Sequence, residues 1–220
     1  MWSDDLELFA LVRQELFSAV IGDVMDQMDL LHQFLPANIA PISPTMVIVG
    51  RAMPVVETDC AEIHHGPAAK PFGLRLEALD DLKPGEVYVT GGQPGNYAQW
   101  GELISARARH LGAVGTILNS YHRDTNGILA VDFPVFSAGA LAQDQGPRGK
   151  VIDYRMPVNV GQAHICPGDI LVGDRDRVCV SCRGRAKPKS FTGRSKRPAA
   201  SLRCAKRSRI REVRHLIINL

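Results

Sequence analysis

The 220-residue chain lacks several features that would place it in common protein classes. It contains no run of 18 consecutive apolar residues, so we expect no membrane-spanning helix. Its first residues are acidic and lack the basic-then-apolar order of a signal peptide. The five cysteines are odd in number, which argues against a disulfide framework. We therefore expect a cytoplasmic protein. A Gly-rich nucleotide-binding signature after the first predicted strand is also missing, which disfavours a methyltransferase.

Acidic residues are almost absent from the C-terminal part of the chain. Residues 181–220 contain 13 Lys and Arg but only one acid, Glu212, whereas residues 1–180 contain 13 Lys and Arg against 22 Asp and Glu. Residues 181–209 also have almost no apolar periodicity, so they cannot bury enough surface to fold alone. We predict one domain over residues 1–180 and a poorly ordered or altered basic tail over residues 181–220.

The basic tail raises the question of a nucleic-acid partner. Its charge would suit RNA, DNA or an acidic protein surface, and binding would be electrostatic. Apart from Phe191, however, the tail has no aromatic residues interleaved with its basic ones. We therefore favour non-functional disorder for the tail and do not expect nucleic acid as a partner.

Hydrophobic periodicity predicts a layered α/β or α+β domain. Residues 5–32 show a helical period, with a second short helix starting near Gly22. Residues 46–49 are apolar and β-branched and predict a strand that ends at Gly50. Residues 149–180 predict an antiparallel ladder of short strands. The other predicted elements are helices at 77–82 and 99–111 and strands at 52–56, 86–90, 114–118 and 133–136.

The segment from Gly91 to Asp124 carries the residues best suited to chemistry. A predicted helix begins near Gly101, and His122, Arg123 and Asp124 lie just beyond the predicted strand that ends near Leu118. Ligands of open α/β sheets bind outside the carboxyl ends of strands, so we expect these residues to converge. The helix start suits a small carboxylate or phosphate, Arg offers a fork for a carboxylate, and Asp offers oxygen to Mg²⁺. The alternative is an ordinary Arg–Asp salt bridge in a surface turn.

Several motifs resemble, in order and spacing, those of the RraA-like family. That family includes aldolases for 4-hydroxy-4-methyl-2-oxoglutarate and 4-carboxy-4-hydroxy-2-oxoadipate, and the regulator of ribonuclease E activity. The resemblance covers roughly residues 15–180. The matching motifs are Trp-Gly-Glu-Leu at 100–103, Gly-Ala-Val-Gly at 112–115, Arg-Asp at 123–124, Gly-Arg-Ala at 50–52, Lys-Pro-Gly-Glu-Val-Tyr-Val at 83–89, Phe-Pro-Val-Phe at 133–136 and Pro-Gly-Asp-Ile-Leu-Val at 167–172.

The resemblance implies an α/β fold, namely a three-layer β/β/α swivelling domain that assembles as homotrimers or homohexamers with sites at subunit interfaces. It also implies that Asp124 binds a divalent metal, Mg²⁺ or Mn²⁺, directly, and that Glu102 binds it through water. Arg123 would contact the ketone and carboxylate of pyruvate. The rest of the small 2-oxo acid site would be formed by Gly101, Leu103 and Ile104, the last two through their backbone N–H groups.

The implied function is a metal-dependent lyase that cleaves a 4-hydroxy-2-oxo acid to pyruvate, with Arg123, Glu102 and Asp124 as catalytic residues. A metal and an arginine would stabilise the charge of the pyruvate enolate, and the same chemistry allows decarboxylation of oxaloacetate. The alternative is a non-catalytic regulator that binds a ribonuclease.

Departures from the family pattern bear on both functions. The pair Asn119-Ser120 replaces the family's Asp-Gly, and Arg177 replaces a turn glycine. After Val180 the family's acidic helix, whose carboxylate reaches the neighbouring subunit's metal site in active aldolases, is missing. The intact set of Glu102, Arg123 and Asp124 favours the enzyme, and the missing carboxylate favours the regulator.

Overall fold

A mixed β-sheet forms the centre of the molecule. The computed structural model describes residues 4–60, 72–92 and 95–181, so the predictions for residues 182–220 lie outside the described part. Within these residues, eight strands form one sheet in the order β1-β7-β5-β3-β2-β11-β12, with β8 also paired to β2. The strands are β1 (Ala40–Pro41), β2 (Ile48–Asp59), β3 (Glu86–Gly92), β5 (Gly115–Ile117), β7 (Val135–Ser137), β8 (Gly149–Tyr154), β11 (Ile170–Asp174) and β12 (Arg177–Ser181).

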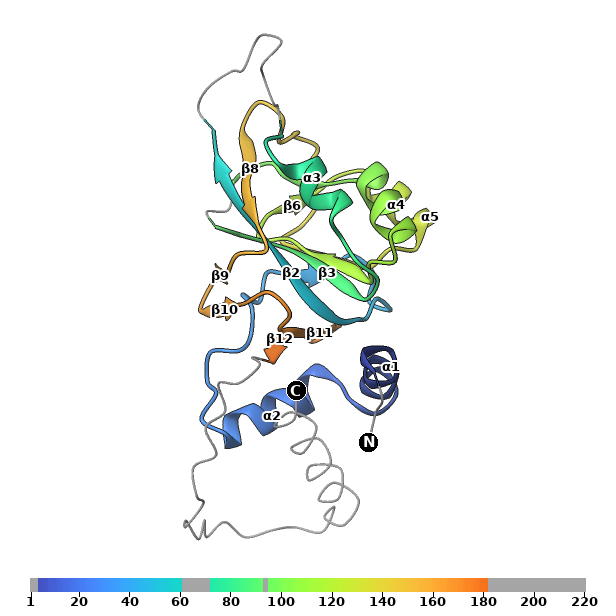
Figure 1. Cartoon of the computed structure of the whole chain (residues 1–220), viewed down its shortest axis with the longest axis vertical. Coiled ribbons are helices and arrows are strands. Elements are labelled where there is room, and N and C mark those ends of the chain that lie inside the picture. The colour runs from blue at the N-terminus through green and yellow to red at the C-terminus, as the bar shows by residue number, and fades with distance from the viewer. Residues whose placement is uncertain (1–3, 61–71, 93–94, 182–220) are drawn as a thin grey trace, which may run out of the picture.

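The middle of this sheet is parallel. Strands β2, β3, β5 and β7 pair side by side in parallel, while β1, β8, β11 and β12 join antiparallel. Parallel strands require crossover segments that cover a face of the sheet. Here α3 (Arg75–Asp80), α4 (Glu102–His110) and α5 (Thr125–Val131) supply that cover and gather on one side of the sheet (Figure 1).

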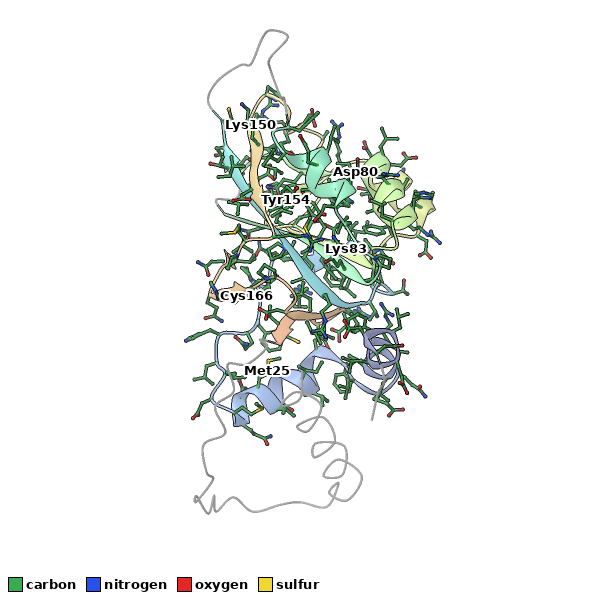
Figure 2. All side chains as sticks on the ribbon, in the orientation of Figure 1. Met25, Asp80, Lys83, Lys150, Tyr154 and Cys166 are labelled. Atoms are coloured by element: carbon green, nitrogen blue, oxygen red, sulfur yellow. The ribbon has the colours of Figure 1, made fainter. Side chains whose placement is uncertain are left out.

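The helix-covered face holds a core in which aromatic rings stack. Trp100 stacks on Phe133 with ring centroids 6.1 Å apart and contacts Tyr88 at 4.9 Å. An exposed ion pair between Asp80 of α3 and Arg107 of α4, 2.9 Å long, links the two helices at the surface, where Figure 2 labels Asp80. This layer lies directly behind the candidate site.

The opposite face is covered by a β-hairpin of β9 (Val158–Val160) and β10 (Ala163–Ile165). Their buried side chains join those of β2, β3, β5 and β7 in a second core. Hairpin, sheet and helices make three layers, which confirms the predicted α/β, three-layer β/β/α fold. Two further helices lie at the other end of the molecule (Figure 1): α1 (Asp5–Glu15) packs on β2, and α2 (Ser18–Gln27) packs on β11 and β12.

Three sequence predictions were wrong in detail. The second helix starts at Ser18 rather than near Gly22, because α1 ends at Glu15 and two extended residues follow. Gly50 does not end a strand: β2 runs through it without a turn, since Gly50 itself pairs with Leu171 of β11 and the pairing with β3 begins at the next residue, Arg51. Residues 149–180 do not form one ladder, because β8 and β11 each pair with β2.

Two short strands outside the main sheet position the candidate site. These are β4 (Ala98–Trp100) and β6 (Tyr121–His122), which pair in parallel. Neither was predicted as a strand, nor was α5, which follows β6 after two residues. Among the described residues, no helix is long and apolar enough to cross a membrane.

Candidate active site between two helix starts

The site forms where the chain leaves β4 and β6 at the same edge. Gly101 follows β4 and begins α4, while Arg123 and Asp124 follow β6 and begin α5. Because parallel neighbours end at one edge, the two helix starts come together. The backbone N–H of Arg123 donates to the Trp100 carbonyl at 2.9 Å and fixes this approach. The structure thus brings Gly101, Arg123 and Asp124 together, as the sequence predicted.

Gly101 and Asp124 are in close contact. A Cβ atom on Gly101 would lie 2.5 Å from Oδ2 of Asp124, so only glycine leaves room for this carboxylate. Asp124 has a left-handed backbone (φ 57°, ψ 40°), and its side chain makes no capping hydrogen bond to α5. Aspartate adopts this conformation more readily than most residues. The turn therefore presents a carboxylate that is not used to cap its own helix.

Arg123 lies between two carboxylates. Its Nε is 3.6 Å from Oδ2 of Asp124, and its Nη1 is 3.2 Å from Oδ1 of Asp144. All three side chains are between 36 and 45% exposed, so each ion pair contributes little to stability. An arginine held this way can exchange its partners for a bound carboxylate at small cost.

A pocket of about 240 Å³ opens in front of these residues. Its walls are mainly apolar and carry two guanidinium groups, those of Arg75 and Arg123. Such a mixture of apolar walls and a few polar groups is typical of small-molecule sites. The lining residues are Phe72, Arg75, Leu76, Ala98, Trp100, Gly101, Leu103, Ile104, Arg123, Asp124 and Asp144.

The first turn of α4 borders this pocket. Gly101, its N-cap, makes no side-chain capping hydrogen bond, and Leu103 and Ile104 line the pocket. N–H groups in a first helical turn lack intrahelical partners and carry partial positive charge. Leu103 and Ile104, whose amides were predicted to bind a carboxylate, thus line the same pocket as Arg123.

Glu102 takes a different position from the other predicted residues. It is exposed at the start of α4, but its carboxylate packs over Gly127 of α5, where a Cβ would overlap it. It is not among the residues that line the pocket. The structure therefore brings Glu102 beside α5 rather than into the pocket wall.

The donor set suits a hard, hydrated divalent cation. No group of three or more His, Cys, Asp or Glu side chains in the described segments could enclose a metal ion. Mg²⁺ does not need such a cage, because it usually keeps several waters and binds one or two carboxylates. Asp124, uncapped and with the space of Gly101 beside it, fits that mode of binding.

His122 is a buried residue that supports the site through two side-chain hydrogen bonds. Its Nδ1 is 2.7 Å from the Ser137 hydroxyl and its Nε2 is 3.0 Å from the Thr125 hydroxyl. Burial lowers the pKa of His122, so the neutral imidazole is favoured. These two contacts link β7 to the start of α5 through a buried side chain and hold the Asp124 turn in place.

Arg75 was not among the predicted site residues. It is only 4% exposed, yet it lines the same pocket as the motif residues Gly101, Arg123 and Asp124. A signal was available in the sequence, because Arg75 lies three and four residues before Ala78 and Leu79. Residues at this spacing share one helix face, and here that face is buried.

Comparisons with known proteins place this fold in a family. The family described as Aldolase/RraA, or RraA-like, matches residues 18–180. A solved structure described as one of novel cellulases from microbes of the gut ecosystem superposes with a TM-score of 0.73 at 27% identity, covering 82% of this chain and 79% of that one. Streptomyces coelicolor RraAS2, described as an unusual member of the RNase ES inhibitor RraA family, superposes with a TM-score of 0.68 at 18% identity, covering 80% and 85%.

The chain belongs to the RraA-like family. A Halalkalibacterium halodurans protein provisionally named a 4-hydroxy-4-methyl-2-oxoglutarate aldolase is 30% identical to it over 111 residues. That match covers 50% of this chain and 52% of the relative. The chain therefore matches about half the length of that relative, and its family contains both aldolase-named proteins and RraA proteins.

Proposed function

We propose that the chain is a divalent-metal-dependent carbon–carbon lyase that releases pyruvate from a 4-hydroxy-2-oxo acid and also decarboxylates oxaloacetate. The observation that carries this proposal is the contact between Gly101 and the uncapped Asp124 carboxylate, with Arg123 and the start of α4 beside it. A carboxylate, an arginine and helix amides at one pocket form a set suited to 2-oxo acid chemistry.

The carboxylates would bind the metal, and the backbone amides would bind the substrate. Asp124 would hold Mg²⁺ or Mn²⁺ directly, and Glu102, exposed at the start of α4, would rotate from Gly127 to bind it through water. When bound, the cation supplies positive charge that stabilises an enolate. The amides of Leu103 and Ile104 would bind the substrate carboxylate, with Gly101 leaving room beside them.

Arg123 would bind the 2-oxo group and the carboxylate together, since its guanidinium offers donors in a fork. In the cleavage the C3–C4 bond breaks and its electron pair forms the enolate of pyruvate. The 4-hydroxyl loses its proton as the second carbonyl product forms, and a proton returns to C3. The negative charge that develops on the 2-oxo oxygen strengthens its bond to Arg123, which lowers the barrier.

The assay for this proposal is pyruvate release coupled to NADH oxidation by lactate dehydrogenase. Substrates are 4-hydroxy-2-oxoglutarate, 4-hydroxy-4-methyl-2-oxoglutarate and oxaloacetate, each with Mg²⁺ or Mn²⁺ and with excess chelator. Release that requires the metal is the expected result. Absence of pyruvate from every substrate in well-folded protein would exclude the lyase.

Assembly as a homotrimer or homohexamer is part of the proposal. Leu76 and Leu103 line the pocket but are 60 and 82% exposed, which suits side chains that a second copy of the chain covers. Light scattering on the purified protein measures the oligomeric state. A monomer at the concentration of the activity assay would contradict this part.

The second candidate is a regulator that binds a ribonuclease without catalysis. It is favoured by the similarity to RraAS2 and by the position of the Glu102 carboxylate outside the pocket lining. A pull-down with the endoribonuclease of the source cell tests it. Binding with no metal-dependent turnover would support the regulator, and turnover with no binding would remove it.

A further inference from the structure

A cluster of buried polar groups lies behind the pocket. Four buried side-chain atoms have no hydrogen-bond partner among the described residues: Oε2 of Glu57, Nε of Arg75, the hydroxyl of Tyr88 and Oε1 of Gln145. Each of the four residues is at most 4% exposed. Buried polar atoms are normally paired, so four such atoms within one region point to a function.

These four residues come from separate elements that meet under α3. Glu57 and Tyr88 lie on the neighbouring strands β2 and β3, Arg75 opens α3, and Gln145 precedes β8. Gln145 donates to Glu57 through its Nε2. Burial raises the pKa values of Glu57 and Tyr88, and the charge of Arg75 opposes both rises, so the three groups are within electrostatic reach.

Arg75 is the member of the cluster that reaches the pocket. Its Nη2 donates to the Gln99 carbonyl, and its guanidinium lies 5.7 Å from the centroid of the Phe72 ring. No carboxylate within the described segments forms an ion pair with it. Burying a guanidinium without an ionic partner is costly, and a bound anion would offset that cost.

The two arginines of the pocket come from different walls. Arg123 follows β6 and lies beside the start of α4, whereas Arg75 opens α3. On the proposed function, the first wall binds the 2-oxo acid end of the substrate. Arg75 is then available to bind the part of the substrate on the far side of the bond that is cleaved.

We propose that Arg75 is a specificity-determining residue that binds a second, terminal carboxylate of the substrate. This inference rests on the proposed function and adds one residue to it: Arg75 would hold the far carboxylate of a dicarboxylic 2-oxo acid and so distinguish it from a monocarboxylic one. The guanidinium offers a bidentate site for that carboxylate.

The surroundings of Arg75 are compatible with an anion. Burial raises the pKa of Glu57 to about 7, so this carboxyl is partly protonated at neutral pH and repels an anion less. The other acids of the pocket are Asp124 and Asp144, both next to Arg123. Negative charge in the lining is therefore concentrated at the Arg123 end.

The first test measures binding without turnover. Trp100 lines the pocket, so its fluorescence reports binding in a Trp2→Phe background, where it is the only tryptophan. The probes are 2-oxoglutarate and 2-oxopentanoate, which share a five-carbon chain and differ in a terminal carboxylate or methyl group. Arg75→Met should weaken 2-oxoglutarate binding on the order of 10- to 100-fold and leave 2-oxopentanoate binding unchanged.

Arg75→Lys is the second variant, because it keeps the charge and removes the fork. It should retain part of the preference for 2-oxoglutarate, which keeps the test decisive if Arg75→Met fails to fold. If binding of both probes is weakened equally, Arg75 has only a structural role. An unchanged preference in either folded variant would overturn the proposal.

The second test compares turnover of 4-hydroxy-2-oxoglutarate and 4-hydroxy-2-oxopentanoate, which differ in the same way. Arg75→Met should lower kcat/KM for the first on the order of 10-fold or more and leave the second nearly unchanged. If no substrate releases pyruvate while Arg75 still sets the binding preference, the lyase proposal fails and the Arg75 site stands. If Arg75→Met has the wild-type kcat/KM for both substrates, the proposed role of Arg75 is rejected and the lyase proposal stands.

Discussion

At the scale of single residues, Gly101 explains why the pocket can expose a carboxylate. Its backbone is extended (φ −155°), so glycine is not needed there for conformational freedom. It is needed for space, because Oδ2 of Asp124 occupies the position beside its missing Cβ. Gly101 is therefore important because it has no Cβ that would displace the candidate metal ligand Asp124.

Gly101→Ala should therefore abolish activity while the fold is kept. The new methyl group must displace the Asp124 carboxylate, and we expect pyruvate release to fall on the order of 100-fold, the scale of effect expected for a displacement of about 1 Å at a reacting centre. Gly168→Ala is the matched control, since Gly168 (φ 83°) has open space around it and does not line the pocket. It should lose stability and keep kcat; equal activities in the two variants would refute the role of Gly101.

Glu57 makes stability depend on pH. Burial raises its pKa in the folded state from 4.5 to about 7; the positive charge of Arg75 opposes this rise, and the negative charge of Asp59 adds to it. The folded state therefore favours the protonated carboxyl. Above about pH 4.5 the unfolded chain ionises first, so stability falls as the pH rises toward 7.

Glu57→Gln should remove this dependence. The shift corresponds to about 3 kcal/mol lost by the wild type between pH 4.5 and pH 7.5 and not lost by the variant. Urea unfolding of both proteins at several pH values measures the difference. Parallel pH profiles for wild type and variant would show that Glu57 is not the group responsible.

At the scale of elements, the sequence predicted regular segments better than it predicted where they pair. The strand at 86–90 and the helix at 99–111 correspond to β3 and α4, although α4 begins only at Glu102. These segments carry their own periodicity and turn residues. The short strands β4 and β6 have none, because they form through long-range pairing: with each other, and through Ala98 with Asp144 and His122 with Ala140.

Gly50 shows why pairing partners could not be read from the sequence. A glycine after an apolar run indicates a strand end, but Gly50 lies inside β2 because another segment approaches it. A Cβ there would be 2.6 Å from the Gly85 carbonyl oxygen and 2.5 Å from the Val114 side chain. That contact is long-range, and no local pattern encodes it.

Gly50→Ala should accordingly destabilise the protein by about 1–3 kcal/mol through overpacking. Guanidinium unfolding measures the loss. Val47→Ala, at a half-exposed residue just before β2, is the control and should change stability by less than about 0.5 kcal/mol. If Gly50→Ala is no worse than the control, β2 and the segment before β3 are not in close contact.

At the scale of the whole molecule, the sequence predicted more of the candidate site than of the residues that surround it. The convergence of Gly101, Arg123 and Asp124 followed from strand ends and from the family motifs. The buried cluster around Arg75 did not, because its members are scattered from residue 57 to residue 145 and meet only in the folded chain. The outward turn of Glu102 is likewise a matter of side-chain packing against α5.

The central claim is that the Asp124 carboxylate, through a bound metal, enables carbon–carbon cleavage, and α5 offers a matched pair of variants to test it. Asp124 and Asp132 flank this helix, and both have left-handed backbones (φ 57° and 54°), which asparagine also adopts readily. We would measure pyruvate release with Mg²⁺ for the wild type, Asp124→Asn and Asp132→Asn. We expect a loss on the order of 100-fold or more for Asp124→Asn and near wild-type release for Asp132→Asn. Chelator should abolish release in all three, and metal-dependent release that survives in Asp124→Asn would contradict the account.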